Sequence, residues 1–329
     1  MVLGRPAPLV KDVGNISLAL VGKVDENDHP YSWSAILNGY DSEKLADCPN
    51  PIIRDYLTAQ PKHDFGIPGV GITHIWCDNP EDAERVAAVS LIPQIVNRPE
   101  DVIGQVDAVL IPTDKGHEHL ERARPFVEVG LPVFIDKPLT DREDHLLEFI
   151  RWQQEGKHLM SSSCMRYARE FLDIHQRKDE LGDLRFLTST TCKSWERYGI
   201  HAIEAAYLFL RPLGWVSVTN SGTQGADIVH IRHGSGVDVV VASVDDMYGA
   251  FGHLSLYGTK GTISTHFRDS FSAFKSQLAA FITFLRVGEP SYSFAETVEI
   301  MRIIIAGICS RGAGGRTIML SDVGTSNPK

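Results

Sequence analysis

The sequence predicts an α/β protein with an N-terminal doubly wound parallel sheet (a Rossmann fold) and a C-terminal α+β domain on a mostly antiparallel, open sheet. Up to about residue 165, short apolar runs without polar alternation, typical of strands buried on both faces, alternate with helical patterns. After about residue 180, strands follow one another through tight turns that contain glycine. A length of 329 residues also exceeds one typical domain, so we expect a division into residues 1–165 and 166–329.

The first part of the chain contains the strands expected to form the parallel sheet, which are 16–22, 71–77, 108–111, 131–135 and 158–164. Helices are expected between them at 31–37, from Pro80 onward, and at 99–105, 117–129 and 142–155. Residues 38–69 are rich in Pro, Asp and Gly and should hold extra loops or a short helix. Pro125 lies inside its helix and should kink or split it.

The second part is expected to contain five hairpin-linked strands, which are 184–191, 215–221, 227–233, 237–244 and 253–257. An amphipathic helix is expected to begin near Gly199, which would place His201 in its first turn. Two later helices, one with an apolar stripe that includes Phe281 and one at about 295–311, are expected to cover this second sheet.

Composition and charge exclude several classes of protein. The net charge of -10 argues against nucleic acid or an anionic membrane as the main partner. Five scattered cysteines exclude a zinc ribbon or a disulfide framework and fit a reducing compartment, and we predict no metal site. The N-terminus has no secretion signal, and the longest apolar runs are too short to span a bilayer. We therefore expect a cytoplasmic protein.

The chain around residues 131–140 carries the strongest functional signal. A buried strand there ends in Asp136-Lys137-Pro138. Ligands of open α/β sheets bind beyond the carboxyl ends of the strands, so Lys137 is expected beside a substrate. Pro138 restricts Lys137 and raises the odds of a cis peptide bond. The alternative is an exposed lysine followed by a proline that ends the element.

Half of a dinucleotide fingerprint follows the first strand. Gly22 is followed by a loop, a helix and a second strand that ends at Asp78. A carboxylate there would bind a ribose diol and repel a 2′-phosphate, which favours NAD over NADP, although Asp78 could instead help to cap the next helix. The usual G-x-G-x-x-G is absent, and three carboxylates follow Gly22 in this loop. Lys23 and the helix N-terminus could offset them toward a pyrophosphate.

A second group of candidate residues lies in the helix near Gly199. His201 is expected to take the proton of a substrate hydroxyl, and Glu204, one turn further on, could orient its imidazole. The ammonium of Lys137 would stabilise negative charge that develops on the same oxygen, if the second domain closes over the first. The alternative for His201 is a hydrogen-bonded histidine of the core.

In order and type, these motifs resemble the Gfo/Idh/MocA family of nicotinamide-dependent oxidoreductases. Asp136-Lys137-Pro138 is similar to the family's Glu-Lys-Pro, and Gly199 to Glu204 is similar to its Gly-x-His-x-x-Asp. His119 and Glu121 fall where the family has a His and a Glu on the helix before that strand, and 258–261 matches its sheet-domain turn. The resemblance spans nearly the whole chain.

The resemblance implies an NAD(P)-dependent dehydrogenase that acts on a sugar or polyol, with 1–165 as the dinucleotide-binding domain and 166–329 for substrate binding and oligomerisation. It implies that Lys137 contacts substrate and nicotinamide ribose and that His201 accepts the proton. The cofactor-binding residues would be Gly22, Lys23, Asp78, Pro112, Thr113, His119, Asp136, Lys137 and Pro138. The substrate pocket would add Arg166, Lys193, Trp195 and Tyr198, each of which has an ordinary surface or core alternative. Association through the open face of the second sheet would give a homodimer or homotetramer.

Two departures from the family pattern leave open a different class of protein, one without catalytic activity. The Gly-rich loop is eroded, and Arg197 replaces the acid that usually precedes the family's His by four positions. Both favour a non-catalytic binding or regulatory protein that keeps the fold. The retained Lys137 and His201 favour the enzyme.

Overall fold

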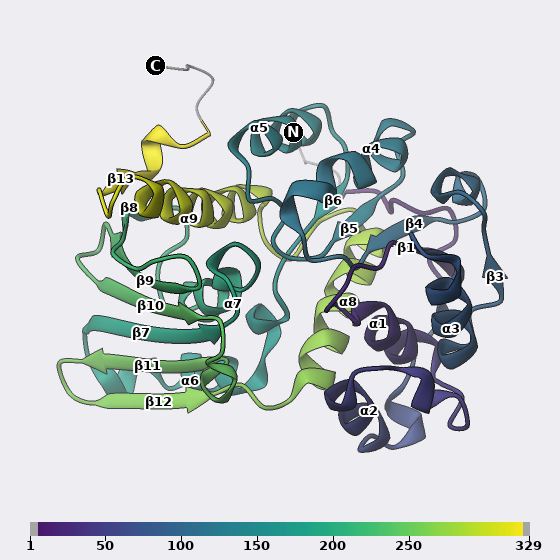
Figure 1. Ribbon diagram of the computed structural model, residues 1–329, viewed down its shortest axis with the longest axis horizontal. Helices are drawn as coiled ribbons and strands as arrows, with labels where there is room; N and C mark the ends of the chain where they lie inside the picture. Colours follow the sequence, from purple (N-terminus) through teal and green to yellow (C-terminus); the bar gives the residue numbers. More distant parts are fainter. Residues whose placement is uncertain (1–5, 325–329) are drawn as a thin grey trace.

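The computed structural model describes residues 6–324 and contains two sheets with their helices (Figure 1). Sheet A has six parallel strands in the order β3-β2-β1-β4-β5-β6, which confirms the predicted doubly wound sheet. Its strands are β1 (Ile16–Val21), β2 (Val70–Trp76), β3 (Gln94–Ile95), β4 (Ala108–Ile111), β5 (Val133–Ile135) and β6 (Leu159–Met160). The strand order reverses between β1 and β4, so the ligand crevice of this fold lies at their carboxyl ends.

The helices of this half are α1 (His29–Asn38), α2 (Pro51–Thr58), α3 (Pro80–Ser90), α4 (His119–Glu128) and α5 (Glu143–Gln154). The short helix expected within 38–69 is α2. The helix expected at 99–105 is only a 3-10 turn, Pro99–Val102. Pro125 lies inside α4 without splitting it.

Sheet B has the strand order β12-β11-β7-β10-β9-β8-β13. Its strands are β7 (Leu184–Cys192), β8 (Trp215–Asn220), β9 (Ala226–His233), β10 (Asp238–Val244), β11 (His253–Gly258), β12 (Thr262–His266) and β13 (Ile318–Met319). Among the strands that the structure describes in this sheet, only β7 and β10 pair in parallel, so the prediction of a mostly antiparallel sheet is confirmed. Strands β12 and β13 were not predicted, because they lie at the two edges and neither contains a fully buried residue.

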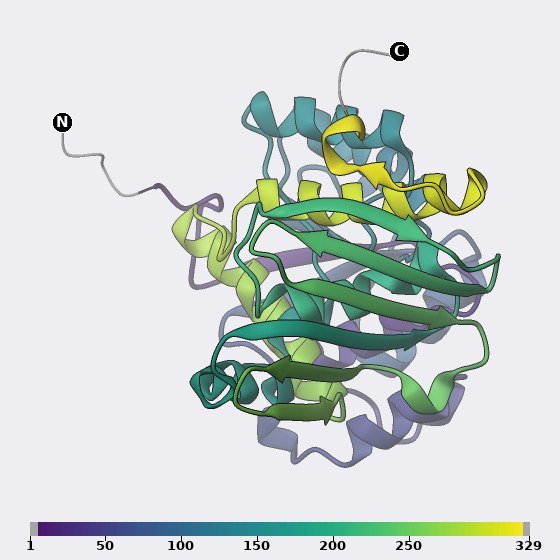
Figure 2. The ribbon, with the colours of Figure 1, turned by 90° about the vertical axis from the view of Figure 1, so that its left-hand side faces the viewer.

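The remaining helices are α6 (Arg169–Gln176), α7 (Trp195–Tyr207), α8 (Ser270–Val287) and α9 (Phe294–Gly312). Helices α7 and α9 pack on one face of sheet B, and Figure 2 shows the other face bare in the described part of the chain. The expected helix start near Gly199 is wrong, because α7 already begins at Trp195. A Cβ at Gly199 would lie 2.5 Å from the Trp195 ring, so this glycine allows close packing and does not mark a helix end.

The expectation that α8 covers sheet B is also wrong. The Phe281 ring of α8 lies 5.5 Å from that of Phe134 in β5, and Phe274 lies 6.5 Å from Trp33 in α1. Helix α8 therefore packs against the sheet A half, beside α1 (Figure 1). The chain returns to sheet A after building most of sheet B, and the division after residue 165 stays a prediction. Within 6–324, no helix combines the length and apolarity that a membrane crossing requires.

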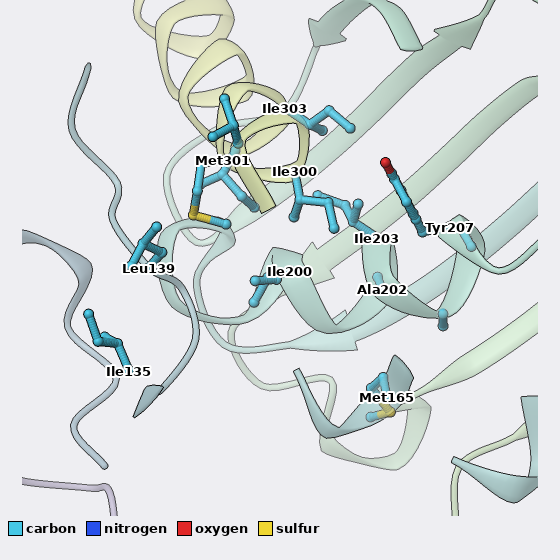
Figure 3. Close-up of a cluster of buried hydrophobic side chains, with 14 of the residues drawn as sticks. Ile135, Leu139, Met165, Ile200, Ala202, Ile203, Tyr207, Ile300, Met301 and Ile303 are labelled. Carbon is cyan, nitrogen blue, oxygen red and sulfur yellow. The ribbon is translucent and has the colours of Figure 1, made fainter. Parts of the chain in front are cut away.

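An apolar cluster joins the half of the chain that contains sheet A to the half that contains sheet B. Figure 3 shows Leu139, which follows β5, beside Met301 of α9, with Ile200 of α7 nearby. The backbone N–H of Thr140 also donates to the Met301 sulfur, at 3.4 Å. The loop that carries Lys137 is therefore packed against the helices that carry and support His201.

Candidate active site

Lys137 lies at the carboxyl end of β5 and is only 1% exposed. Its peptide bond to Pro138 is cis. The Lys137 Nζ lies 3.4 Å from Asp114 Oδ2 and 4.4 Å from the centroid of the Tyr198 ring. Burial alone would lower the pKa of Lys137, but Asp114, Tyr198 and Asp136 together outweigh burial and raise this pKa above its ordinary value. The alternative of an exposed lysine is wrong, and the side chain is a buried ammonium.

Asp114, which sequence reasoning missed, pairs with two cations. The Arg197 Nη2 lies 2.9 and 3.1 Å from the two carboxylate oxygens of Asp114. The Arg197 Nη1 lies 3.2 Å from Glu26 Oε2. Burial alone would raise the pKa of Asp114, but Lys137 and Arg197 together hold it well below its usual range. The available signal was its position: Asp114 follows β4 at the edge where Lys137 follows β5.

His201 lies in the second turn of α7, and its Nδ1 is 2.7 Å from Ser163 Oγ. Burial, and then the nearby Lys137 charge, lowers the pKa of His201 well below its ordinary value, so the imidazole is neutral. Glu204 does not bond to this ring as expected. It accepts hydrogen bonds from the Ser163 N–H, at 3.3 Å, and from Arg166 Nε, at 2.6 Å.

A cavity of about 330 Å³ opens beside His201, between the loop after β1, helix α2 and the ends of the sheet B strands. Lys193 and Tyr198, which the resemblance implies for a substrate pocket, are among its lining residues, and the Lys193 Nζ lies 4.6 Å from the Tyr198 ring centroid. Lys137 does not line this cavity, although its Nζ also lies close to the Tyr198 ring, at 4.4 Å from the centroid.

Two residues predicted for the substrate pocket lie elsewhere. Trp195 is fully buried, and its Nε1 donates to the Ile304 carbonyl at 2.9 Å, so it has the core position that was its alternative. Arg166 pairs with Glu204 and, at 2.9 Å, with Glu296, and it does not line the cavity.

Several predicted cofactor residues meet at the switch point. Gly22 follows β1 with φ 100°, and a Cβ there would lie 3.0 Å from Thr113 and 3.1 Å from the Arg122 guanidinium. The same Arg122 donates to Asp78 at 3.0 Å, while Asn79 caps helix α3. Lys23 lies 3.6 Å from Asp28 and 3.9 Å from Asp82, so carboxylates already surround its ammonium.

The other four residues predicted to bind the cofactor, His119, Asp136, Pro112 and Pro138, make hydrogen bonds to other residues of the protein. The fully buried His119 places Nε2 2.8 Å from the Thr113 carbonyl oxygen and Nδ1 2.9 Å from that of Pro138, which joins the loops after β4 and β5. The Asp136 carboxylate lies 2.6 Å from His29 Nδ1. The carbonyl of Pro112 accepts a hydrogen bond from the Asn27 side chain, at 3.0 Å.

The N-terminus of α1, where this fold binds a pyrophosphate, has no free N–H in its first turn. Pro30 has none, the N–H of His29 donates to Asn27 Oδ1 at 2.8 Å, and the next two N–H groups donate to the Asp28 carbonyl. Asn27 is 4% exposed, and its bond to Pro112 crosses the crevice from the β1 loop to the β4 loop. In this closed arrangement, the crevice residues do not fit a dinucleotide. No group of three His, Cys, Asp or Glu side chains that could hold a metal ion occurs within 6–324.

No protein-family model and no curated protein matches the chain. Its structure is similar to that of myo-inositol 2-dehydrogenase from Lactobacillus plantarum, with a TM-score of 0.72, 13% identity, and coverage of 93% of this chain and 99% of that one. For a myo-inositol dehydrogenase from Corynebacterium glutamicum ATCC 13032, the TM-score is 0.68, the identity 18%, and the coverage 96% and 100%.

A third similar structure is scyllo-inositol dehydrogenase from Lactobacillus casei with bound cofactor NAD(H) and scyllo-inositol. Its TM-score is 0.70 at 11% identity, and the match covers 93% of this chain and 99% of that one. At such identities a likeness establishes the fold and leaves the activity to be argued from the site. The chain has the fold of these inositol dehydrogenases, which agrees with the fold that the resemblance of its motifs predicted.

Proposed function

We propose that this protein is an oxidoreductase that transfers hydride between a nicotinamide dinucleotide and a hydroxyl or carbonyl group of a sugar or polyol. The observation that carries the proposal is the meeting of Lys137 and His201 at Tyr198. Lys137 comes from sheet A and His201 from the helix on sheet B, and their side chains lie 4.4 and 4.9 Å from the Tyr198 ring centroid. The fold shared with inositol dehydrogenases supports the same reading.

The bound dinucleotide would accept or supply the hydride, and the residues of this chain would handle the proton. His201 Nε2 has no hydrogen-bond partner among residues 6–324. When Ser163 Oγ accepts from Nδ1–H, Nε2 carries the lone pair that can take the proton of a substrate hydroxyl. The Lys137 ammonium would stabilise the negative charge that develops on that oxygen.

The cavity wall supports a polyol as the substrate. It combines aromatic surfaces, such as Tyr56 and Phe251, with polar side chains, such as Asn50 and Lys193. Asp78 at the end of β2 favours NAD over NADP, because its carboxylate repels a 2′-phosphate. A cytoplasmic location and a homodimer or homotetramer, associated through the bare face of sheet B, belong to the same proposal.

A panel of inositols and sugars, each assayed with NAD and with NADP, tests the proposed function. We expect nicotinamide reduction with at least one polyol, and faster with NAD. A panel in which no polyol is turned over with either dinucleotide, and none of the matching ketones is reduced, would contradict it.

A second candidate is a binding or regulatory protein without turnover, which the closed crevice favours. This candidate predicts that calorimetry detects a sugar or polyol in the cavity, while neither NADH nor NADPH binds. The two candidates therefore separate on dinucleotide binding alone.

Ser163→Ala is expected to lower kcat about fivefold and to change KM little. The substitution removes the hydroxyl that holds the His201 ring, and a buried hydrogen bond contributes about 1 kcal/mol, where about 1.4 kcal/mol corresponds to tenfold. Steady-state kinetics of Ser163→Ala and Ser163→Thr measure the effect. Threonine keeps the hydroxyl and should restore part of kcat; equal kcat in all three proteins would exclude a positioning role for Ser163.

A further inference from the structure

We infer that the dinucleotide crevice is closed by a latch of this chain's own residues, Glu26, Asn27, Asp114 and Arg197, and that the cofactor enters only when the latch opens. The inference rests on the proposed function and adds a conformational step to it. The latch joins three elements, which are the loop after β1, the loop after β4 and helix α7.

The inner contact of the latch is the hydrogen bond from Asn27 Nδ2 to the Pro112 carbonyl, at 3.0 Å. It spans the gap between the carboxyl ends of β1 and β4, where the strand order of sheet A reverses. Because a dinucleotide must lie in this gap, Asn27 and the cofactor compete for the same space.

The outer contact is ionic. Arg197 bridges the buried Asp114 carboxylate and Glu26, at 2.9 and 3.2 Å. Glu26 lies in the loop that departs from the family's Gly-rich pattern, and Arg197 is the other departure that the sequence contains, so the structure pairs a residue of each departure. Their pairing gives each departure a physical reason.

The outer contact of the latch is the weaker one, so we expect the latch to open there first. The Glu26 side chain is 72% exposed, so water and salt compete for its ion pair with Arg197. Glu26 also adopts φ 62°, a left-handed conformation that a side chain with a Cβ disfavours. The loop is therefore held by contacts at its inner end and only weakly at its tip.

Opening would also uncover the candidate catalytic lysine. Arg197 and Tyr198 are neighbours on α7, and the Tyr198 ring covers the Lys137 Nζ. In the closed form Asp114 binds Lys137 and Arg197 together. Release of Arg197 therefore opens the outer contact of the latch and loosens the cover over Lys137 in one movement.

Arg197→Met tests the latch, because it removes both ion pairs and keeps an apolar side chain of similar length. NADH is titrated into the full-length protein, followed by energy transfer from tryptophan. We expect the Kd for NADH to fall on the order of tenfold, as it would if the open form were populated at about 10% in the wild type. Arg185→Met, which removes an exposed arginine paired with Asp183, is the matched control and should bind as the wild type does.

Asn27→Ala provides a second, independent opening of the latch and should also tighten NADH binding. Unchanged or weaker binding in both Arg197→Met and Asn27→Ala, with measurable binding in the wild type, would overturn the latch and leave the proposed function standing. If none of the variants binds NADH or NADPH, the proposed function fails, and the latch fails with it.

Discussion

Lys137→Ala is expected to lower kcat/KM by about a hundredfold to a thousandfold, the usual cost of removing one group that stabilises charge in the transition state. The Lys137 ammonium is buried and charged, and it lies 4.4 Å from the centroid of the Tyr198 ring. Steady-state kinetics with the polyol found in the panel measure the loss, and circular dichroism checks that the fold persists. The fold should persist because Asp114 keeps Arg197 as a partner when Lys137 is removed.

Two further variants separate charge from packing. Lys137→Met keeps most of the buried volume and removes only the ammonium, so its kcat/KM should be as low as that of Lys137→Ala. Lys193→Met removes a cation at a similar distance from the Tyr198 ring, but in the cavity wall, and should act mainly on KM. Turnover at the wild-type rate in Lys137→Met would exclude a catalytic role for this lysine.

The central strands of sheet A were predictable from the sequence because they are buried on both faces, which leaves continuous apolar runs such as 108–111 and 133–135. The apolar stripe of α8 was equally visible, but a stripe shows that a helix is buried without showing against which sheet. Gly199 was misread for a related reason. Its local signal is that of a helix end, and the Trp195 ring that requires a glycine there becomes visible only when α7 is formed.

The candidate site likewise contains residues that the sequence predicted and partners that it did not. Lys137 and His201 follow from local patterns, a strand end and an amphipathic helix. Their partners Asp114 and Ser163 were missed, because pairing depends on how distant segments meet: Asp114 lies 83 positions from Arg197, and Ser163 lies 38 from His201. Likewise, the carboxylates after Gly22 could be judged unfavourable for a pyrophosphate from the sequence, but Arg197 could not be named as the partner of Glu26.

Arg166→Ala is expected to lower the free energy of unfolding by about 3–5 kcal/mol at neutral pH, the usual cost of leaving a buried charge without its partner. Arg166 is buried between Glu204, at 2.6 Å, and Glu296, at 2.9 Å, and lies 4.2 Å from the Tyr292 ring centroid. Urea unfolding measures the loss. Arg177→Ala, which breaks an exposed pair with Glu180, is the matched control and should cost less than about 1 kcal/mol.

The pH dependence of this loss identifies its cause. Burial raises the pKa of Glu204 above its ordinary value of 4.5, although Arg166 opposes the shift. Removing Arg166 should raise this pKa further, so the folded variant takes up the proton at a higher pH than its unfolded chain does. The cost of the charged carboxylate is then full at neutral pH and disappears as the pH falls through the raised pKa toward 4.5. Adding Glu204→Gln should restore part of the stability at neutral pH; a loss that is independent of pH, and unchanged in the double variant, would instead assign it to lost packing against Tyr292.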